Sequence, residues 1–145
     1  MANHATWSKL VARTNRNFAG ARSRCAKPGW HACYDRRHHQ VTLWKHGRLW
    51  NSWLVRGGAS NHKTRRGVHP VYWRDKDHVS SLYGSPMPYS QFFDGGQALH
   101  GSGLMVNPWE GHSHGCVNLY IEDARQLWRL TANKRLVVHV YGAWD

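Results

Sequence analysis

The spacing of apolar and polar residues predicts a chain built mainly of β-strands. Residues 41–44 and 49–55 are rich in β-branched and aromatic side chains, and a His-Gly turn at 46–47 separates them. This pattern is typical of a β-hairpin. Residues 67–73 predict another strand, and Pro70 places it at a sheet edge or a bulge because proline donates no backbone hydrogen bond.

The second half of the chain adds the clearest helix and a closing strand. Residues 97–100 predict a short strand, and residues 136–140 predict a buried one. Residues 121–130 predict a helix with acidic residues in its first turn and a basic residue near its end, as the helix dipole favours. Residues 84–97 contain several glycines and prolines, and this composition predicts a long loop with a functional role.

Length and patterning indicate one domain. A chain of 145 residues can bury one core but not two of ordinary size, and 41% hydrophobic residues supply the apolar surface. Residues 6–18 have only a weak helical pattern. We therefore interpret residues 1–29 as a basic N-terminal arm or cap and residues 30–145 as the folded domain, a mainly β structure with one main helix packed on it.

Charge is concentrated in the first half of the chain. The first 66 residues hold fourteen of the twenty lysines and arginines and one acid, Asp35, so they carry +13 and the remaining residues carry −1 of the net charge of +12. Such an excess indicates a polyanionic partner, either nucleic acid or an anionic wall or membrane surface; a surface that only keeps the protein soluble is the alternative. No recognisable nucleic-acid-binding motif accompanies the charge, so nucleic acid is not the expected partner.

The sequence also bears on location. No apolar run approaches the roughly 18–20 residues that cross a bilayer, so no transmembrane segment is expected. The first thirty residues lack the apolar stretch of a secretory signal, because arginines interrupt each candidate, namely Arg13, Arg16, Arg22 and Arg24. A signal already removed, another route of export, and an internal location all remain open.

Three cysteines divide into a pair and a single residue. Cys25 and Cys33 lie eight apart in a loop-like stretch with a Pro-Gly turn at 28–29. A disulfide between them is expected if the protein works in an oxidising compartment. Cys116 is then the odd thiol, either a nucleophile or a buried apolar residue.

The densest chemistry surrounds Cys116. His100 begins this segment, and residues 112–118 read His-Ser-His-Gly-Cys-Val-Asn. A thiol attacks a carbonyl as the thiolate, and histidine is the side chain that takes its proton near neutral pH. Two glycines allow the backbone to turn and to aim N–H groups at a developing oxyanion, Gly101 and Gly115.

A zinc site and a papain-like hydrolase are two alternative interpretations of this segment. His112, His114 and Cys116 alternate, so one face of a strand could present them to zinc, but zinc sites usually have other ligand spacings. No metal site is therefore predicted. A papain-like hydrolase is disfavoured because that family places its cysteine before its histidine, whereas His100 comes first here.

These residues resemble a known family. Residues 113–118, preceded by His100-Gly101 at a loop's distance, are similar to the signature of the L,D-transpeptidase catalytic domain, the YkuD-like fold. The resemblance runs roughly over residues 34–141. Residues 73–78 and 87–96 are similar to a subset of secreted actinobacterial members. The resemblance implies a β-sandwich-like catalytic domain.

The resemblance also implies roles for single residues. Cys116 would be the nucleophile, and His100 would be its base, oriented through its other ring nitrogen by the carbonyl of Gly101. His114 would stabilise charge or position the substrate. The remaining positions would form the oxyanion hole and the substrate site: the N–H groups of Gly115 and Cys116, then Ser113, Asn118 as a residue that fixes the loop, and Tyr89 in a lid.

The substrate implied by the resemblance is the stem peptide of bacterial peptidoglycan. Attack on the bond between a diamino acid and D-Ala would give a thioester, which an amine acceptor would resolve, without metal or organic cofactor. The working place would be extracytoplasmic, and anionic wall polymers are candidate partners. Hydrolysis, exchange of a D-amino acid, and a wall-binding module without turnover are the alternatives.

Two departures from the family pattern stand out. The family usually has a Thr-Pro-x-Gly turn, whereas residues 64–67 read Thr-Arg-Arg-Gly. The loop between His100 and Ser113 is short for the family, which could narrow the donor pocket.

Overall fold

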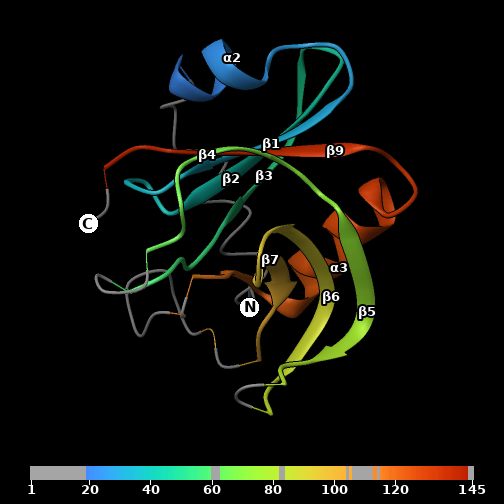
Figure 1. Ribbon diagram of the computed structural model, residues 1–145. Coiled ribbons are helices and arrows are strands. Elements are labelled where there is room, and N and C mark those ends of the chain that lie inside the picture. Colours follow the sequence, from blue (N-terminus) through green and yellow to red (C-terminus); the bar gives the residue numbers. More distant parts are fainter. Residues whose placement is uncertain are drawn as a thin grey trace, which may run out of the picture.

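In the part of the chain that it describes, the computed structural model is a sandwich of two β-sheets with two helices (Figure 1). It describes residues 19–59, 63–81, 84–103, 105, 113 and 115–143. Within this part of the chain, no helix is long and apolar enough to cross a membrane.

The first sheet has five strands and contains both halves of the sequence. Its order is β3 (Arg48–Leu54), β2 (Gln40–Lys45), β1 (Trp30–Asp35), β9 (Leu136–Tyr141) and β4 (Gly67–Pro70). The β1–β9 pair is parallel, and the other pairs are antiparallel. Strand β9 therefore lies inside the sheet, between β1 and β4.

The second sheet has four strands and carries the motif residues. Its order is β5 (Trp73–Val79), β6 (Pro86–Asp94), β7 (Gln97–Gly101) and β8 (Val117–Leu119). The β7–β8 pair is parallel, which brings the segment that starts at His100 beside the segment that follows Cys116.

The two helices lie on different sides of the first sheet. Helix α2 (Ala19–Cys25) lies on the side turned away from the second sheet (Figure 1). Helix α3 (Ile121–Thr131) packs against β6, β7 and β8. Its buried residues include Ala124, Leu127 and Thr131, whose spacing places them on one helical face.

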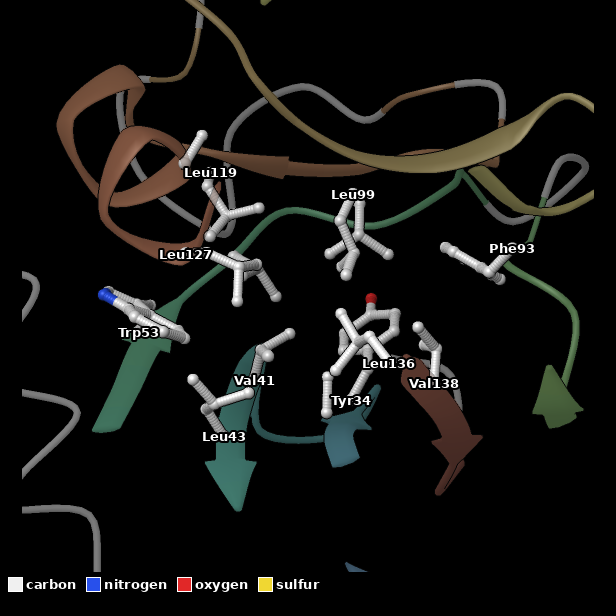
Figure 2. Close-up of a cluster of buried hydrophobic side chains, with 14 of the residues drawn as sticks. Tyr34, Val41, Leu43, Trp53, Phe93, Leu99, Leu119, Leu127, Leu136 and Val138 are labelled. Carbon is white, nitrogen blue, oxygen red and sulfur yellow. The ribbon is translucent and has the colours of Figure 1, made fainter. Parts of the chain in front are cut away.

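The main core fills the space between the sheets (Figure 2). Side chains of the first sheet meet Leu99 of β7, Leu119 of β8 and Leu127 of α3. The residues from the first sheet include Tyr34, Val41, Leu43, Trp53, Leu136 and Val138. Burial of each large apolar side chain stabilises the fold by about 1.5–3 kcal/mol.

Most of the predicted elements are confirmed. The hairpin of β2 and β3, the strand at 97–100, the helix at 121–130 and the closing strand appear within one or two residues of their expected bounds. Pro70 ends β4, an edge strand, as its missing N–H requires. The weakly helical segment at 6–18 lies outside the described residues.

Three expectations about strands were wrong. Residues 84–97 form β6, a turn and the start of β7 instead of a long loop. Residues 67–73 split into β4 and the start of β5, so the chain passes from one sheet to the other there. Cys33 lies within β1 and not in a loop.

The prolines of β6 explain the first of these errors. Pro86 and Pro88 pair with Val79 and Asp77, and the strand tolerates them where it also departs from regular geometry. Tyr89 has a φ of 59°, and the ladder skips its pairing. The prolines therefore mark an irregular strand, which sequence pattern alone did not separate from a loop.

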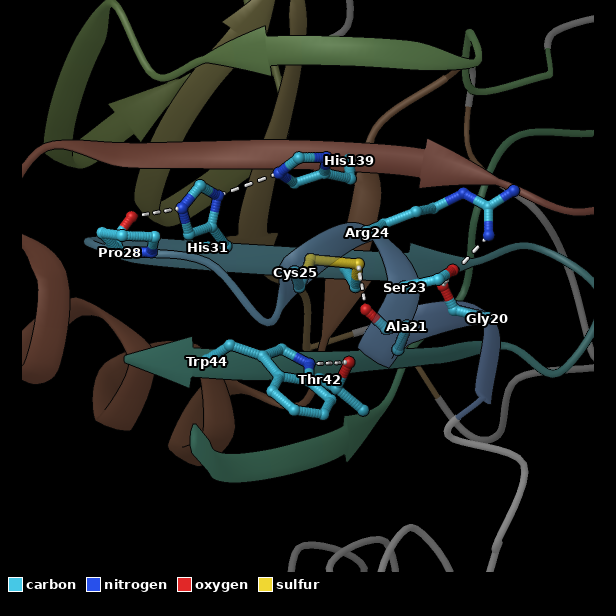
Figure 3. The surroundings of a disulfide bond; sticks show 11 residues. Gly20, Ala21, Ser23, Arg24, Cys25, Pro28, His31, Thr42, Trp44 and His139 are labelled. Carbon is cyan, nitrogen blue, oxygen red and sulfur yellow. Dashed lines mark hydrogen bonds between the residues drawn. A yellow bond between two sulfur atoms is a disulfide. The ribbon is translucent and has the colours of Figure 1, made fainter. Parts of the chain in front are cut away.

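Cys25 and Cys33 form the expected disulfide, which ties α2 to β1 (Figure 3). Both cysteines are buried with Ala21 and Trp44 in a small second core. Residues 19–25 thus pack on the first sheet, although they belong to the segment predicted as an arm. The boundary between residues 29 and 30 stays a prediction.

Candidate active site

The site lies on the face of the second sheet that points away from the main core. Leu99 and Val117 enter the main core, and His100 pairs with Asn118 across the β7–β8 ladder. Because side chains alternate along a strand, His100, Cys116 and Asn118 share the opposite face. There Cys116 packs against Met87, Phe92 and Ala98.

The His100 ring is held by its own neighbour. Its Nδ1 lies 2.7 Å from the carbonyl oxygen of Gly101. A carbonyl only accepts, so Nδ1 carries the proton and Nε2 of the neutral ring carries a lone pair that can accept a hydrogen bond. This contact is the one predicted from the family resemblance. Gly101 has little room for a side chain, because a Cβ there would lie 3.2 Å from Ile121 Cα, closer than an ordinary contact.

Asn118 links His100 to a buried arginine. With its amide turned to satisfy both neighbours, its nitrogen donates to His100 Nε2 at 2.9 Å. Its oxygen accepts from Arg56 Nε and Nη2 at 3.1 and 2.8 Å. The backbones of Arg56 and Asn118 also exchange two hydrogen bonds. Asn118 therefore contacts the ring of His100, and its expected role in fixing the loop stays a prediction.

His100 is neutral at physiological pH. Burial is the largest cause, and it lowers the pKa of His100 to about 4. The Gly101 hydrogen bond raises the pKa, whereas the charges of Arg56 and His78 lower it further. A neutral imidazole can accept a proton, so the ring is in the form that a general base requires.

The Cys116 side chain is a thiol at rest. Its Sγ donates to the carbonyl oxygen of Gly96 at 3.5 Å. Burial raises the pKa of Cys116, and the backbone N–H of Ala98 acts in the opposite direction. Among the described residues no hydrogen bond joins Sγ to His100. The resting pair is therefore a neutral thiol and a neutral imidazole on one face.

The backbone before Cys116 is held from several sides. Gly115 has a φ of 123°, and a Cβ there would lie 2.6 Å from the Gln97 amide nitrogen, so only glycine fits. Thr64 Oγ1 donates to the Gly115 carbonyl at 2.7 Å. The Thr of the variant Thr-Arg-Arg-Gly turn thus supports the loop directly.

The Ser113 side chain bonds to the backbone of Gly115 and Cys116. Its Oγ donates to the Cys116 carbonyl and accepts from the Gly115 N–H at 3.2 Å. The Gly115 N–H, expected to face an oxyanion, is therefore engaged by Ser113. The Cys116 N–H has no acceptor within the described part of the chain, and it is the donor that remains available.

Tyr89 does not join this cluster. Its ring lies 6.1 Å from that of Trp128 on α3, and it packs against the main core. His114 and His112 lie outside the described residues, so the role of His114 stays a prediction and the zinc alternative is not tested. Among the described residues no group of three or more metal-binding side chains comes together.

Sequence reasoning missed three residues that build the site: Arg56, Thr64 as a loop support, and Gln97. Arg56 is 9% exposed although it is charged, which no local pattern indicates. Gln97 Oε1 accepts from the Arg65 N–H at 3.1 Å and its amide lies under Gly115. A polar residue beginning a buried strand was the available signal for Gln97.

Solved structures share this architecture. An L,D-transpeptidase from Stackebrandtia nassauensis is 28% identical, with a TM-score of 0.76 over 85% of this chain and 61% of that one. A Xylanimonas cellulosilytica L,D-transpeptidase is 24% identical, with a TM-score of 0.71 over 79% and 61%. The chain therefore spans about three fifths of the length of these relatives.

A third similar structure is an L,D-transpeptidase named LdtMt1, solved in complex with imipenem. It is 19% identical, with a TM-score of 0.69 over 78% of this chain and 59% of that one, and it shows the shared fold. No curated protein sequence matches the chain. The sequence profile of the L,D-transpeptidase catalytic domain matches residues 30–140, and the chain belongs to that family.

Proposed function

We propose that the protein is a peptidoglycan L,D-transpeptidase with Cys116 as its nucleophile. The observation that carries this proposal is the neutral His100 ring, whose proton sits on the nitrogen bound to Gly101 while Nε2 keeps its lone pair on the face of Cys116. Membership of the family supplies the reaction class.

The first step forms a thioester. Cys116 Sγ attacks the carbonyl carbon between the L-centre of a diamino acid and the terminal D-Ala of a stem tetrapeptide, while His100 Nε2 takes the thiol proton. The Cys116 N–H donates to the developing oxyanion. The C–N bond then breaks, and His100 returns the proton to the departing D-Ala amine.

The second step releases the enzyme. An amine from a neighbouring stem attacks the thioester carbonyl, gives its proton to His100 and forms an amide. The C–S bond breaks, and the proton passes to Cys116. Dividing one acyl transfer into two steps lowers each barrier. No metal or organic cofactor takes part in this scheme.

Asn118 has to yield during the first step. Its amide nitrogen donates to the same Nε2 lone pair that receives the thiol proton. We infer that Asn118 and Arg56 hold the tautomer and ring orientation of His100 at rest, and that the substrate displaces the Asn118 contact. Asn118 is a positioning residue in this account.

Replacing Asn118 by aspartate is expected to shift the pH profile of acylation. A carboxylate 3 Å from the ring favours imidazolium and would raise the His100 pKa from about 4 towards neutrality. The acid limb of the acylation rate against pH would move upward, and activity at pH 7 would fall. Asn118→Ala is the control, since it removes the contact without adding charge. An acid limb that stays in place in Asn118→Asp contradicts the role of Asn118.

An extracytoplasmic location fits the disulfide. Cys25 and Cys33 are paired and buried, and such bonds persist in oxidising compartments. Peptidoglycan stems are exposed in the same compartments. We propose the cell wall or periplasm as the working place and stem peptides as the partners.

Product analysis tests the reaction itself. Purified protein incubated with a disaccharide-tetrapeptide should release D-Ala and give a cross-linked dimer, detected by liquid chromatography with mass spectrometry. A tripeptide product without dimer would instead show a carboxypeptidase, and incorporation of an added D-amino acid would show exchange. Substrate left unchanged by the oxidised protein would contradict an enzymatic role and favour a wall-binding module.

A further inference from the structure

A hollow lies on the other side of the molecule from the candidate active site, against the outer face of the first sheet. It has a volume of about 340 Å³ and lies between α2, the end of β9 and the edge strand β4. Its lining residues are Ser23, Arg24, Lys27, Arg66, Gly67, Val68, His139, Val140, Tyr141 and Gly142. Cys116 belongs to the other sheet, so this hollow is separate from the candidate active site.

Among the described residues, three cations and no acid line the hollow. Arg24 donates to the Gly20 carbonyl at 3.0 Å, and its guanidinium lies 4.2 Å from the centre of the Tyr141 ring. The side chains of Lys27 and Arg66 have no hydrogen-bond or ion-pair partner among the described residues. All three are exposed, so their N–H groups can reach a ligand.

A carboxylate close to the lining residue Gly142, that of Asp35, already has partners. Asp35 accepts from the backbone N–H groups of Arg37 and His38 at 3.1 and 3.3 Å, and it lies 2.7 Å from the His38 ring. These hydrogen bonds stabilise the β1–β2 turn, and Asp35 does not line the hollow. A fourth cation, Arg36, lies close enough for the charge of Arg66 to lower its pKa, after burial as the larger cause.

Among the lining residues His139 is a buried, neutral histidine, and Figure 3 shows it beside His31. His139 Nε2 lies 2.9 Å from His31 Nδ1, and His31 Nε2 donates to the Pro28 carbonyl at 2.8 Å. Burial first, then His31, Lys27 and Arg24, lower the pKa of His139 to about 4. The excess positive charge thus comes from the three exposed side chains, and it is concentrated over His139.

The disulfide holds two of these cations in place. Cys25 lies beside Arg24 in the sequence, and its bond to Cys33 fixes α2 on the sheet (Figure 3). Arg66 comes from the opposite side, next to β4. Cations from two segments far apart in the sequence therefore converge on one hollow, which differs from a uniformly charged surface.

We propose that this hollow binds a phosphate-type oxyanion, carried by the phosphodiester backbone of an anionic wall polymer. Arginine matches phosphate oxygens with paired N–H donors, and lysine adds a compact charge. The polymer source rests on the proposed function, because that function places the chain at the cell wall. Such binding would hold the enzyme at the wall without involving Cys116.

The test uses the full oxidised chain and two probes, a fluorescently labelled oligo(glycerol phosphate) and inorganic phosphate. The triple variant Arg24→Gln, Lys27→Gln, Arg66→Gln is expected to bind the oligomer at least 10-fold more weakly. The slope of log affinity against log salt should fall by about 2, at roughly 0.7 for each lost phosphate contact. NMR of the wild type should show the His139 ring signals shifting as oligomer is added.

A matched control removes the same charge elsewhere. Arg48→Gln, Lys134→Gln, Arg135→Gln alters three exposed cations distant from the hollow and leaves the same net charge, 12 − 3 = +9. It should change affinity by less than about 2-fold. Equal losses in both triple variants, or His139 signals that do not move, would overturn the site.

Two further arms identify the source of the anion. Saturation by inorganic phosphate at the affinity of the oligomer would show a free-anion site and overturn the polymer assignment. Tighter binding of duplex DNA at equal phosphate concentration would do the same. Single Lys27→Gln, with thermal melting, guards against misfolding of the triple variant. Because no readout involves turnover, an inactive enzyme would leave this result unaffected.

Discussion

Replacing Cys116 by alanine is expected to abolish acyl transfer on disaccharide-tetrapeptide while the fold stays intact. The thiol supplies the electrons that form the thioester, and alanine leaves no nucleophile. Cys116→Ser should be nearly as inactive, because a hydroxyl is far less acidic than a thiol and the neutral imidazole is too weak a base for it. Dimer and released D-Ala are measured by mass spectrometry.

The folded state of these variants is the necessary control. Cys116 packs with Met87, Phe92 and Ala98 at the edge of the second sheet, outside the main core. A small cavity there costs stability but should not unfold the domain, and thermal melting checks this. Normal cross-linking by Cys116→Ala would show that the thiol is only a buried apolar side chain.

Replacing His100 by alanine is expected to lower the acylation rate by roughly 100-fold or more, as is typical for a lost general base. This loss corresponds to about 2.7 kcal/mol of transition-state stabilisation. In the wild type the rate should fall as pH drops through about 4, because protonated His100 can no longer accept the thiol proton. The variant should lack this acid limb. Stopped-flow acylation across pH 3–9 measures both effects.

Two other histidines provide comparisons for this variant. His78 Nδ1 lies 3.0 Å from Asp75 Oδ2, and the His78 ring meets that of Phe92 edge to face, so His78→Ala should cost much less activity than His100→Ala. His114 stands beside the nucleophile in the sequence. A larger loss in His114→Ala than in His100→Ala would reverse the roles assigned to them.

The local pattern of the sequence was sufficient to predict much of the fold. The β2–β3 hairpin and α3 carry their turn and dipole signals within a few residues, and both were predicted. β6 was not, because Pro86, Pro88 and the left-handed Tyr89 obscure its alternation. β1 was missed since a Pro-Gly turn precedes it and its buried neighbour β9 lies at the far end of the chain.

The residues of the candidate site also fall into those that local sequence predicted and those that it did not. Cys116, His100 and Gly101 belong to the motif that the sequence predicted, and the β7–β8 ladder places His100 and Gly101 beside the strand that begins directly after Cys116. Arg56 reaches Asn118 only through a contact between distant segments. Burial of a charged side chain depends on tertiary packing, which no local spacing encodes. The same holds for Thr64, which reaches the Gly115 carbonyl across the fold.

Intact-mass spectrometry after incubation with imipenem tests the central claim most directly, because the adduct requires the nucleophile, its base and an open acyl site together. A relative with the same fold has been solved in complex with this compound. The wild-type protein should gain the mass of one imipenem, located on Cys116 by peptide mapping, and His100→Ala should gain it far more slowly. An unmodified wild type, or an equal adduct on Cys116→Ala, would contradict Cys116 as the nucleophile.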